Sequence, residues 1–124
     1  MIFEQLFDAE SSTYTYLIGD GGVAALVDPV REQLERDLER LQALGLKLVH
    51  TLETHIHADH VTSGNQLAER LGSLPVLHAD SPVSCAALRV REGDRFRIGG
   101  IEISVLETPG HTPGACRFCA RAGC

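Results

Sequence analysis

The chain has 124 residues and a formal net charge of -6, with 11 basic and 17 acidic residues. This length fits one domain, and 44% hydrophobic with 23% charged residues is typical of an ordinary globular protein and not of a disordered one. No basic cluster is present that would attract nucleic acid or an anionic membrane. Because the sequence also lacks a membrane-span run and a signal-peptide pattern, we expect a cytoplasmic protein without either partner.

Three short apolar or β-branched runs open the chain, at residues 2–7, 13–18 and 23–27. The last two are separated by residues 19–22, GDGG, which favour a tight reversal, so the sequence predicts a β-meander. In the second run, TYTYLI, apolar side chains fall at both odd and even positions. This pattern is typical of a strand with both faces covered.

Two amphipathic helices follow in the predicted order. From residue 31 to residue 44 four leucines fall at helical spacing between charged residues, and Gly45 suits the C-terminal cap. Residues 63–71 form the second predicted helix, in which Ser63 and Gln66 fit a capping box. The leucine stripe of the first helix is expected to face the core.

The remaining predicted elements are strands. One covers residues 46–52, a short buried one covers residues 74–77, and residues 95–98 and 101–106 flank two glycines as a hairpin. Strand, helix and strand therefore alternate in the first half of the chain. Candidate metal ligands collect in the connecting loops.

The segment THIHADH, residues 54–60, follows one of these strands. It brings four potential ligands together, namely His55, His57, Asp59 and His60. Imidazole and carboxylate groups suit zinc, iron or manganese rather than calcium. A loop leaving a strand can direct all four at one point, so we predict a metal site, where His60 orients Asp59 or binds a second ion.

A further candidate ligand, His111, lies in ETPGHTPG, where the Pro-Gly pairs on either side make a stiff double turn that fixes the imidazole. Asp28, before Pro29 at a strand end, is a turn former, a hydrogen-bond partner of a metal-bound histidine, or both. His50 and His78 lie in or at the end of apolar strands with no second donor nearby in sequence. For these two histidines we favour structural roles.

These residues resemble the metallo-β-lactamase superfamily, whose signature is HxHxDH on the loop after a strand, followed by a distant His. The chain is more closely similar to its persulfide dioxygenase branch over residues 2 to about 115. The segments that carry this resemblance are ESSTYTYLIGD (10–20), LVDPV (26–30), ETHIHADHVTSG (53–64), EGDRFRIGG (92–100) and ETPGHTPG (107–114).

The resemblance implies an α/β fold, the αββα sandwich, and oxidation of the terminal sulfur of glutathione persulfide by Fe(II) and dioxygen to give sulfite and glutathione. In that branch one iron is held by the first His of HxHxDH, by the His of PGHTPG and by a later Asp, so His55 and His111 correspond to iron ligands. His57, Asp59 and His60 then line the site, whereas in the related dinuclear zinc hydrolases they are ligands.

The last residues depart from the family pattern. Where the family continues with an apolar strand and a turn carrying the Asp ligand, the chain reads ACRFCARAGC, and residues 112–124 contain no Asp, Glu or His. We expect an incomplete metallo-β-lactamase-like domain over residues 1–115, mainly the N-terminal half of the sandwich, and a Cys-rich tail over residues 116–124. The tail contains three cysteines, Cys116, Cys119 and Cys124. One interpretation is that they bind metal or undergo redox chemistry. We favour the other interpretation, that they belong to a tail that replaces the family's continuation.

The sequence is therefore compatible with three functions. The first is an iron-dependent persulfide dioxygenase, and the second is a zinc-dependent thioester hydrolase like glyoxalase II, in which two zinc ions generate hydroxide. The third is a non-catalytic metal-binding fragment. An incomplete sandwich would also leave an apolar sheet face uncovered, which predicts a homo-oligomer formed through that face.

Overall fold

The computed structural model describes residues 2–10, 13–53, 64–78, 87–107 and 116–122. Within these ranges the strands and helices in chain order are β1 (Ile2–Asp8), β2 (Thr13–Asp20), β3 (Val23–Val27), a 3₁₀ turn (Arg31–Gln33), α1 (Leu34–Leu44), β4 (Lys47–Leu52), α2 (Gly64–Leu71), β5 (Leu74–His78), β6 (Leu88–Val90), β7 (Arg95–Ile98), β8 (Ile101–Glu107) and β9 (Cys116–Ala122). None of the helices in the described ranges has the length and apolar character needed to cross a membrane.

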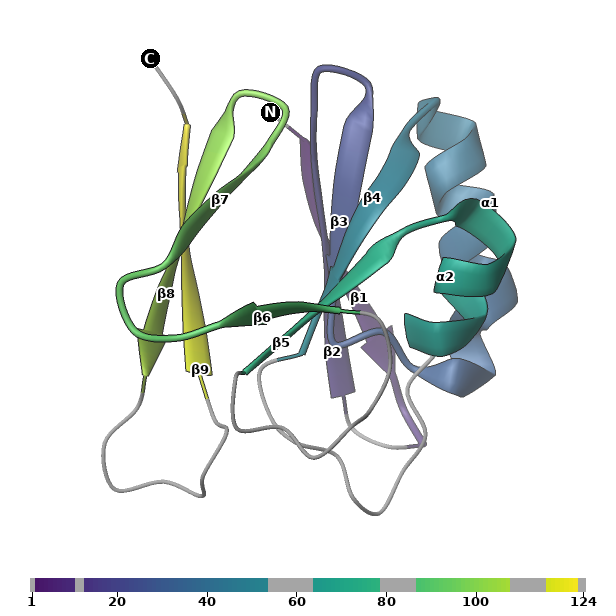
Figure 1. The fold of residues 1–124 in the computed structure, drawn as a ribbon. Helices are drawn as coiled ribbons and strands as arrows, with labels where there is room; N and C mark the ends of the chain where they lie inside the picture. Colours follow the sequence, from purple (N-terminus) through teal and green to yellow (C-terminus); the bar gives the residue numbers. More distant parts are fainter. Residues whose placement is uncertain (1, 11–12, 54–63, 79–86, 108–115, 123–124) are drawn as a thin grey trace.

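The strands form two sheets (Figure 1). The six-stranded sheet has the order β1-β2-β3-β4-β5-β6, and the three-stranded sheet has the order β7-β8-β9. In the larger sheet β1, β2 and β3 pair antiparallel, which confirms the predicted meander, while β3 to β6 pair in parallel. All pairs of the smaller sheet are antiparallel.

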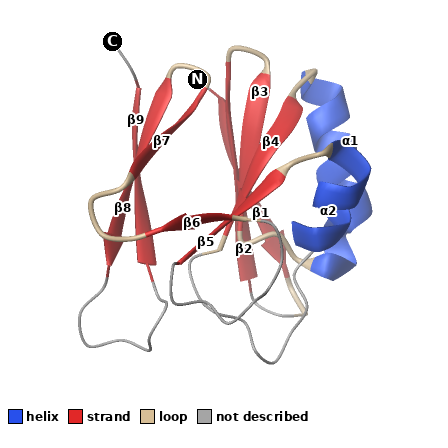
Figure 2. Cartoon of the chain, in the orientation of Figure 1, coloured by secondary structure: helices blue, strands red, loops and turns tan. Residues whose placement is uncertain are grey.

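The elements lie in three layers (Figure 2). The helices α1 and α2 cover one face of the six-stranded sheet, and the β7-β8-β9 sheet lies against its other face. One buried cluster fills the space between the two sheets, and a second joins the large sheet to the helices. The described part of the chain thus has the order helix layer, sheet, sheet.

Strand β2 contributes to both clusters, as its sequence predicts. Leu17 belongs to the cluster under the helices, and Ile18 belongs to the cluster between the sheets. Successive side chains of a strand point to opposite faces, so neighbouring apolar residues reach different cores. Both residues are buried.

Helix α1 follows the leucine pattern. Leu41 is buried in the cluster under the helices, and Leu34, Leu38 and Leu44 pack against that cluster. Gly45 adopts the left-handed conformation at φ 67°, and its N–H reaches the carbonyl oxygens of Leu41 and Gln42. The predicted core stripe and the predicted cap are therefore confirmed. Ser63, the first residue of the predicted capping box, lies outside the described residues.

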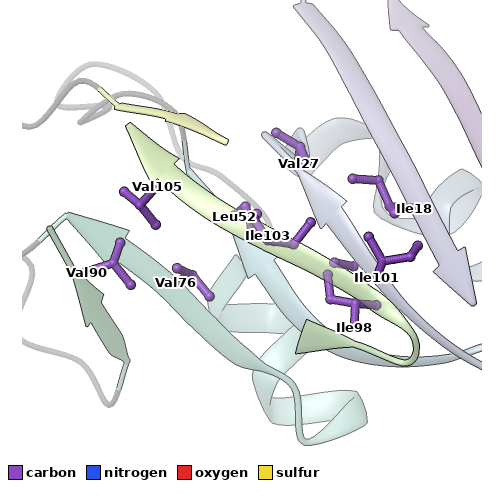
Figure 3. Close-up of a cluster of buried hydrophobic side chains, with 10 residues drawn as sticks. Ile18, Val27, Leu52, Val76, Val90, Ile98, Ile101, Ile103 and Val105 are labelled. Atoms are coloured by element: carbon purple, nitrogen blue, oxygen red, sulfur yellow. The ribbon is translucent and has the colours of Figure 1, made fainter. Parts of the chain in front are cut away.

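The β7–β8 hairpin contributes four of the ten buried residues in the cluster between the sheets (Figure 3). Ile98, Ile101, Ile103 and Val105 are nearly inaccessible to solvent. They pack together with residues of the six-stranded sheet, including Leu52 and Val76. Burial of a branched aliphatic side chain contributes about 1.5–3 kcal/mol, so this hairpin is a principal contact between the sheets.

The turns of two hairpins also meet. The N–H of Gly100 donates to Oδ2 of Asp20 at 2.8 Å. A Cβ on Gly99 would lie 2.3 Å from the carbonyl oxygen of Asp20, and Gly99 has φ 58°. Only glycine fits this contact between the β2–β3 and β7–β8 turns.

Two strands were absent from the expected elements. Strand β6 has three residues and pairs in parallel with β5, so it is too short to show a strand pattern. Strand β9 occupies part of the predicted tail, and its register places Ala122, Ala120 and Phe118 opposite Ile101, Ile103 and Val105. Arginine, cysteine and alanine give little strand signal on their own. The division of the chain at residue 115 stays a prediction.

The outer face of the smaller sheet is largely polar over β7 and β8. On the outer face of β7 and β8 the described residues Arg95, Arg97, Glu102 and Ser104 are polar, and Leu106 is the apolar exception. These strands alternate apolar residues inward with polar residues outward, and the predicted uncovered apolar face stays a prediction.

Exposed aromatic residues occur instead on β1 and β2. Phe3, Phe7 and Tyr14 are 57%, 48% and 48% exposed. Phe3 stacks on Tyr16 with ring centroids 5.6 Å apart, and Phe7 lies 4.8 Å from Tyr14. This aromatic surface adjoins the core between the sheets, because Tyr16 packs against that core. The predicted homo-oligomer itself stays a prediction.

Candidate metal centre

The predicted ligand segments follow two strands that end at the same edge of the molecule. THIHADH comes after β4, and ETPGHTPG starts at the last residue of β8. Figure 1 shows the ends of β4, β5 and β8 together at the lower edge. Near these ends, Leu52 of β4 and Val105 of β8 belong to one buried cluster. The two sheets thus bring the starts of both segments to one side of the fold.

The predicted ligands themselves lie outside the described residues. These are His55, His57, Asp59, His60 and His111. Their assignment as metal ligands stays a prediction based on residue type and on the strands that precede them. Elsewhere, within the described ranges, no group of three or more His, Cys, Asp or Glu residues could hold a metal ion.

Asp28 lies at this edge in an unusual conformation. Among the described residues, Asp28 is the non-glycine residue that has a positive φ, with a value of 53°. Its N–H donates to the carbonyl oxygen of Leu52 at 2.7 Å, and its own carbonyl accepts from Thr15 Oγ1 at 2.9 Å. The left-handed conformation costs roughly 1 kcal/mol for a residue with a Cβ. Asp28 is therefore a turn former beside the strand that leads to His55; a contact between its carboxylate and a metal-bound histidine stays a prediction.

Glu53 was missed by the sequence analysis. Its side chain is buried, and its N–H donates to the carbonyl oxygen of Val76 at 3.3 Å. It is a carboxylate directly after an apolar strand and directly before THIHADH, a position that could have marked it. A buried carboxyl group therefore lies at the start of the ligand segment.

His50 has the structural contacts that we favoured from the sequence. Its Nδ1 lies 3.0 Å from the carbonyl oxygen of Leu74. Its ring meets Phe96 edge to face, with centroids 5.5 Å apart. These contacts join β4 to β5 and to the second sheet. The side chain of His78, at the end of β5, lies outside the described residues.

Two cysteines of the tail, Cys116 and Cys119, lie in β9. The register pairs Cys116 with Glu107 and Cys119 with Ser104. Positions separated by an odd number of residues lie on opposite faces of a strand. The role of the tail cysteines stays a prediction.

The comparison with protein families identifies the fold. Residues 9–123 match the model of the metallo-beta-lactamase superfamily. The chain belongs to this superfamily. Its strand meander, parallel strands and second sheet are thus the metallo-β-lactamase fold, as the sequence motifs predicted.

Curated relatives fall into two groups. The chain is 38% identical over 120 residues to a mitochondrial persulfide dioxygenase ETHE1 of Mus musculus, and the match covers 95% of this chain and 47% of the relative. It is 36% identical over 114 residues to a hydroxyacylglutathione hydrolase of Rhizobium meliloti, covering 88% of this chain and 43% of the relative. The chain spans about half the length of the curated relatives it matches.

Solved structures of the superfamily agree with this fold. The structure of ETHE1 from Myxococcus xanthus is 48% identical with a TM-score of 0.91, and the match covers 97% of this chain and 54% of that chain. A metallo-beta-lactamase from Staphylococcus aureus is 30% identical with a TM-score of 0.88, covering 98% of this chain and 39% of that chain.

Proposed function

We propose that this chain carries the metal-binding part of an iron-dependent persulfide dioxygenase that oxidises glutathione persulfide with dioxygen. The observation that carries the proposal is the similarity to ETHE1 from Myxococcus xanthus, 48% identity at a TM-score of 0.91. The similarity to the mouse persulfide dioxygenase, 38% over 120 residues, supports it.

The donor set fits a single Fe(II) ion by chemistry. His55 and His111 would supply two imidazoles, and Asp59 or His57 is available for a third position unless another polypeptide supplies it. Two histidines and one carboxylate are the ligand set of non-haem Fe(II) oxygenases. Bound iron would supply the activation of dioxygen for oxidation of the terminal persulfide sulfur.

Other residues of the chain would position these ligands. The Asp28 hydrogen bond to Leu52 ties the end of β3 to the end of β4, immediately before the segment that contains His55. Glu53 is buried at the start of that segment, which limits where the chain can leave the sheet. Ligands that leave a rigid scaffold in a fixed direction lose less entropy when they bind the metal.

Oxygen uptake tests the proposed activity. Iron-loaded protein is mixed with glutathione persulfide, and dioxygen consumption and sulfite formation are followed together. We expect both signals, in equal amounts, because one dioxygen and one water convert the persulfide to sulfite and glutathione. His55→Ala should abolish them, while His50→Gln, a change at a histidine outside the predicted ligand set, should retain them.

A zinc-dependent thioester hydrolase is the second candidate, favoured by the 36% identity to the Rhizobium meliloti hydroxyacylglutathione hydrolase. In that case His57, Asp59 and His60 would be ligands, and two zinc ions would generate the attacking hydroxide. His60→Ala separates the candidates. It should remove one of two zinc ions from a hydrolase but leave the single iron of a dioxygenase in place.

A metal-binding fragment without catalysis is the third candidate. Metal binding alone would raise the melting temperature, since a ligand that binds only the folded state stabilises it. A rise in melting temperature with Fe(II), without oxygen uptake or thioester hydrolysis, would select this candidate.

A further inference from the structure

The outer face of β7 and β8 is positively charged. The side chains of Arg95 and Arg97 are 68% and 61% exposed, and both pair with one carboxylate, Glu102, at 3.7 and 3.9 Å. In the register of β8 with β9, position 121 lies opposite Glu102 and position 117 lies opposite Leu106, and both positions hold arginine. We call this surface, defined by Arg95 and Arg97, the arginine face.

The outer surface of the helix layer is negatively charged. Glu32, Glu35 and Glu39 are exposed, and Glu35 is 83% exposed. Their spacing places them on one side of the helix and of the turn that precedes it. Among the described residues, Arg70 of α2 pairs with Glu35 at 3.4 Å. We call the surface of these three residues the glutamate face.

Arg36 and Arg40 of α1 direct their hydrogen bonds away from the glutamate face, although the charge of Arg40 also interacts with Glu39. Arg36 donates to the carbonyl oxygen of Phe7 at 2.9 Å and to Oδ1 of Asp37 at 3.1 Å. Arg40 forms a two-point ion pair with Glu4, with distances of 2.6 and 3.0 Å. Both guanidinium groups are thus engaged with β1 or with α1 itself.

The two faces lie on opposite outer layers of the molecule (Figure 2). We propose that the chain associates head to tail, with the glutamate face of one copy bound to the arginine face of a second copy. The α1 helix of the first copy then lies on the outer surface of the β7–β8 sheet of the second copy, which adds a helical layer there. A second copy is the favoured occupant because it carries a complementary face, whereas the net charge of -6 opposes binding to a long polyanion.

The physical character of this contact follows from its charges. Exposed ion pairs are individually weak, and salt screens them, with a Debye length of about 10 Å at 0.1 M and about 3 Å at 1 M. A head-to-tail contact uses different surfaces on the two copies, so a third copy can add to the second. Association is therefore concentration-dependent, open-ended and suppressed by salt.

Sedimentation velocity of the wild-type chain tests the salt dependence. At ~0.02 M NaCl the mean mass should rise with protein concentration to at least about twice the monomer mass, and at ~0.5 M NaCl it should return to the monomer value of 13.4 kDa. A chain that is monomeric under both conditions overturns the proposal. Association that persists or strengthens at high salt also overturns it, and instead implicates the aromatic surface of Phe3, Phe7 and Tyr14.

Two charge-neutralised variants test the faces. Arg95→Gln/Arg97→Gln retains only the glutamate face, and Glu35→Gln/Glu39→Gln retains an intact arginine face with a weakened partner face. Each alone should stay monomeric at low salt. An equimolar mixture should form a 1:1 dimer that does not grow, because each copy contributes one intact face. A mixture that stays monomeric contradicts the proposed pairing.

A matched control separates the glutamate face from a general effect of charge. Glu10→Gln/Glu92→Gln makes the same change in net charge at exposed residues outside both faces. This variant should associate like the wild type, and its loss of association would overturn the proposal. Circular dichroism establishes that each variant is folded, and the wild-type salt dependence tests the contact even where a variant does not fold.

Discussion

The backbone N–H of Asp28 donates a 2.7 Å hydrogen bond to the carbonyl oxygen of Leu52. This bond joins the ends of two parallel strands at the point where β4 continues into the segment with His55, His57, Asp59 and His60. The left-handed φ of Asp28 is part of the same arrangement, because it turns the chain at the end of β3. The joined ends of β3 and β4 therefore form part of the scaffold that precedes the predicted metal centre.

The two roles of Asp28 are separable by two substitutions. Asp28→Gly removes the carboxylate and relieves the backbone, whereas Asp28→Ala removes the carboxylate and keeps a Cβ at positive φ. If the carboxylate supports a metal-bound histidine, both variants should lose roughly 10-fold or more in metal affinity. Asp28→Ala should also be less stable than Asp28→Gly by about 1 kcal/mol in urea unfolding. Unchanged metal affinity in both variants would leave Asp28 as a turn former alone.

Gly99 should be intolerant of a side chain. Gly99→Ala would put a Cβ 2.3 Å from the carbonyl oxygen of Asp20 and force the two turns apart. We expect a loss of about 2 kcal/mol or more in the free energy of unfolding, from the clash together with the positive φ.

Gly45→Ala is the control for this change. Gly45 has φ 67°, and no atom lies within 4 Å of the position that a Cβ would occupy, so only the backbone cost of about 1 kcal/mol applies. Equal destabilisation of the two variants would mean that the turn-to-turn contact contributes nothing. Chemical denaturation of both variants gives the comparison.

Asp37 should make stability pH-dependent. Burial raises the pKa of its carboxyl from 3.8 to about 6, although the ion pair and hydrogen bond with Arg36 oppose the rise. A raised folded-state pKa means that the folded protein binds the proton more tightly than the unfolded chain. The contribution of Asp37 to the free energy of unfolding is on the order of 3 kcal/mol. It is fully present below about pH 4 and is lost as the pH rises to about 6.

Asp37→Asn tests this linkage. The free energy of unfolding of the variant should not fall between about pH 4 and pH 6 as that of the wild type does. The stability of the variant relative to wild type should therefore increase over that interval. Urea unfolding at several pH values measures the difference. Glu35→Gln, at an exposed carboxylate of the same helix, should show no comparable change. A pH profile of Asp37→Asn parallel to that of wild type would contradict the assignment.

The fold was largely predictable where side-chain periodicity is strong. The alternation that ends in Leu17 and Ile18 correctly indicated a strand with two covered faces, and the leucine spacing of α1 correctly indicated its buried stripe. Strand β9 was not predictable because Arg117, Cys119 and Arg121 carry little intrinsic strand preference. Its formation depends on pairing with β8, which is a tertiary interaction.

The candidate site was predictable in its ligand types but not in its supports. The spacing of His55 and His57 follows directly from the sequence, and the superfamily it indicated is the one that the chain belongs to. The burial of Glu53 and the positive φ of Asp28 depend on how β3, β4 and β5 pack side by side. Local sequence does not encode such relationships between strands.

Metal analysis of the purified chain tests the central claim most directly. Separate samples are loaded anaerobically with Fe(II) alone or with Zn(II) alone, freed of unbound metal, and measured for metal content beside His55→Ala and His111→Ala. The account predicts about one iron per chain in the wild type and a loss of that iron in both variants. Iron content unaffected by both substitutions, or about two zinc ions per chain, would contradict it.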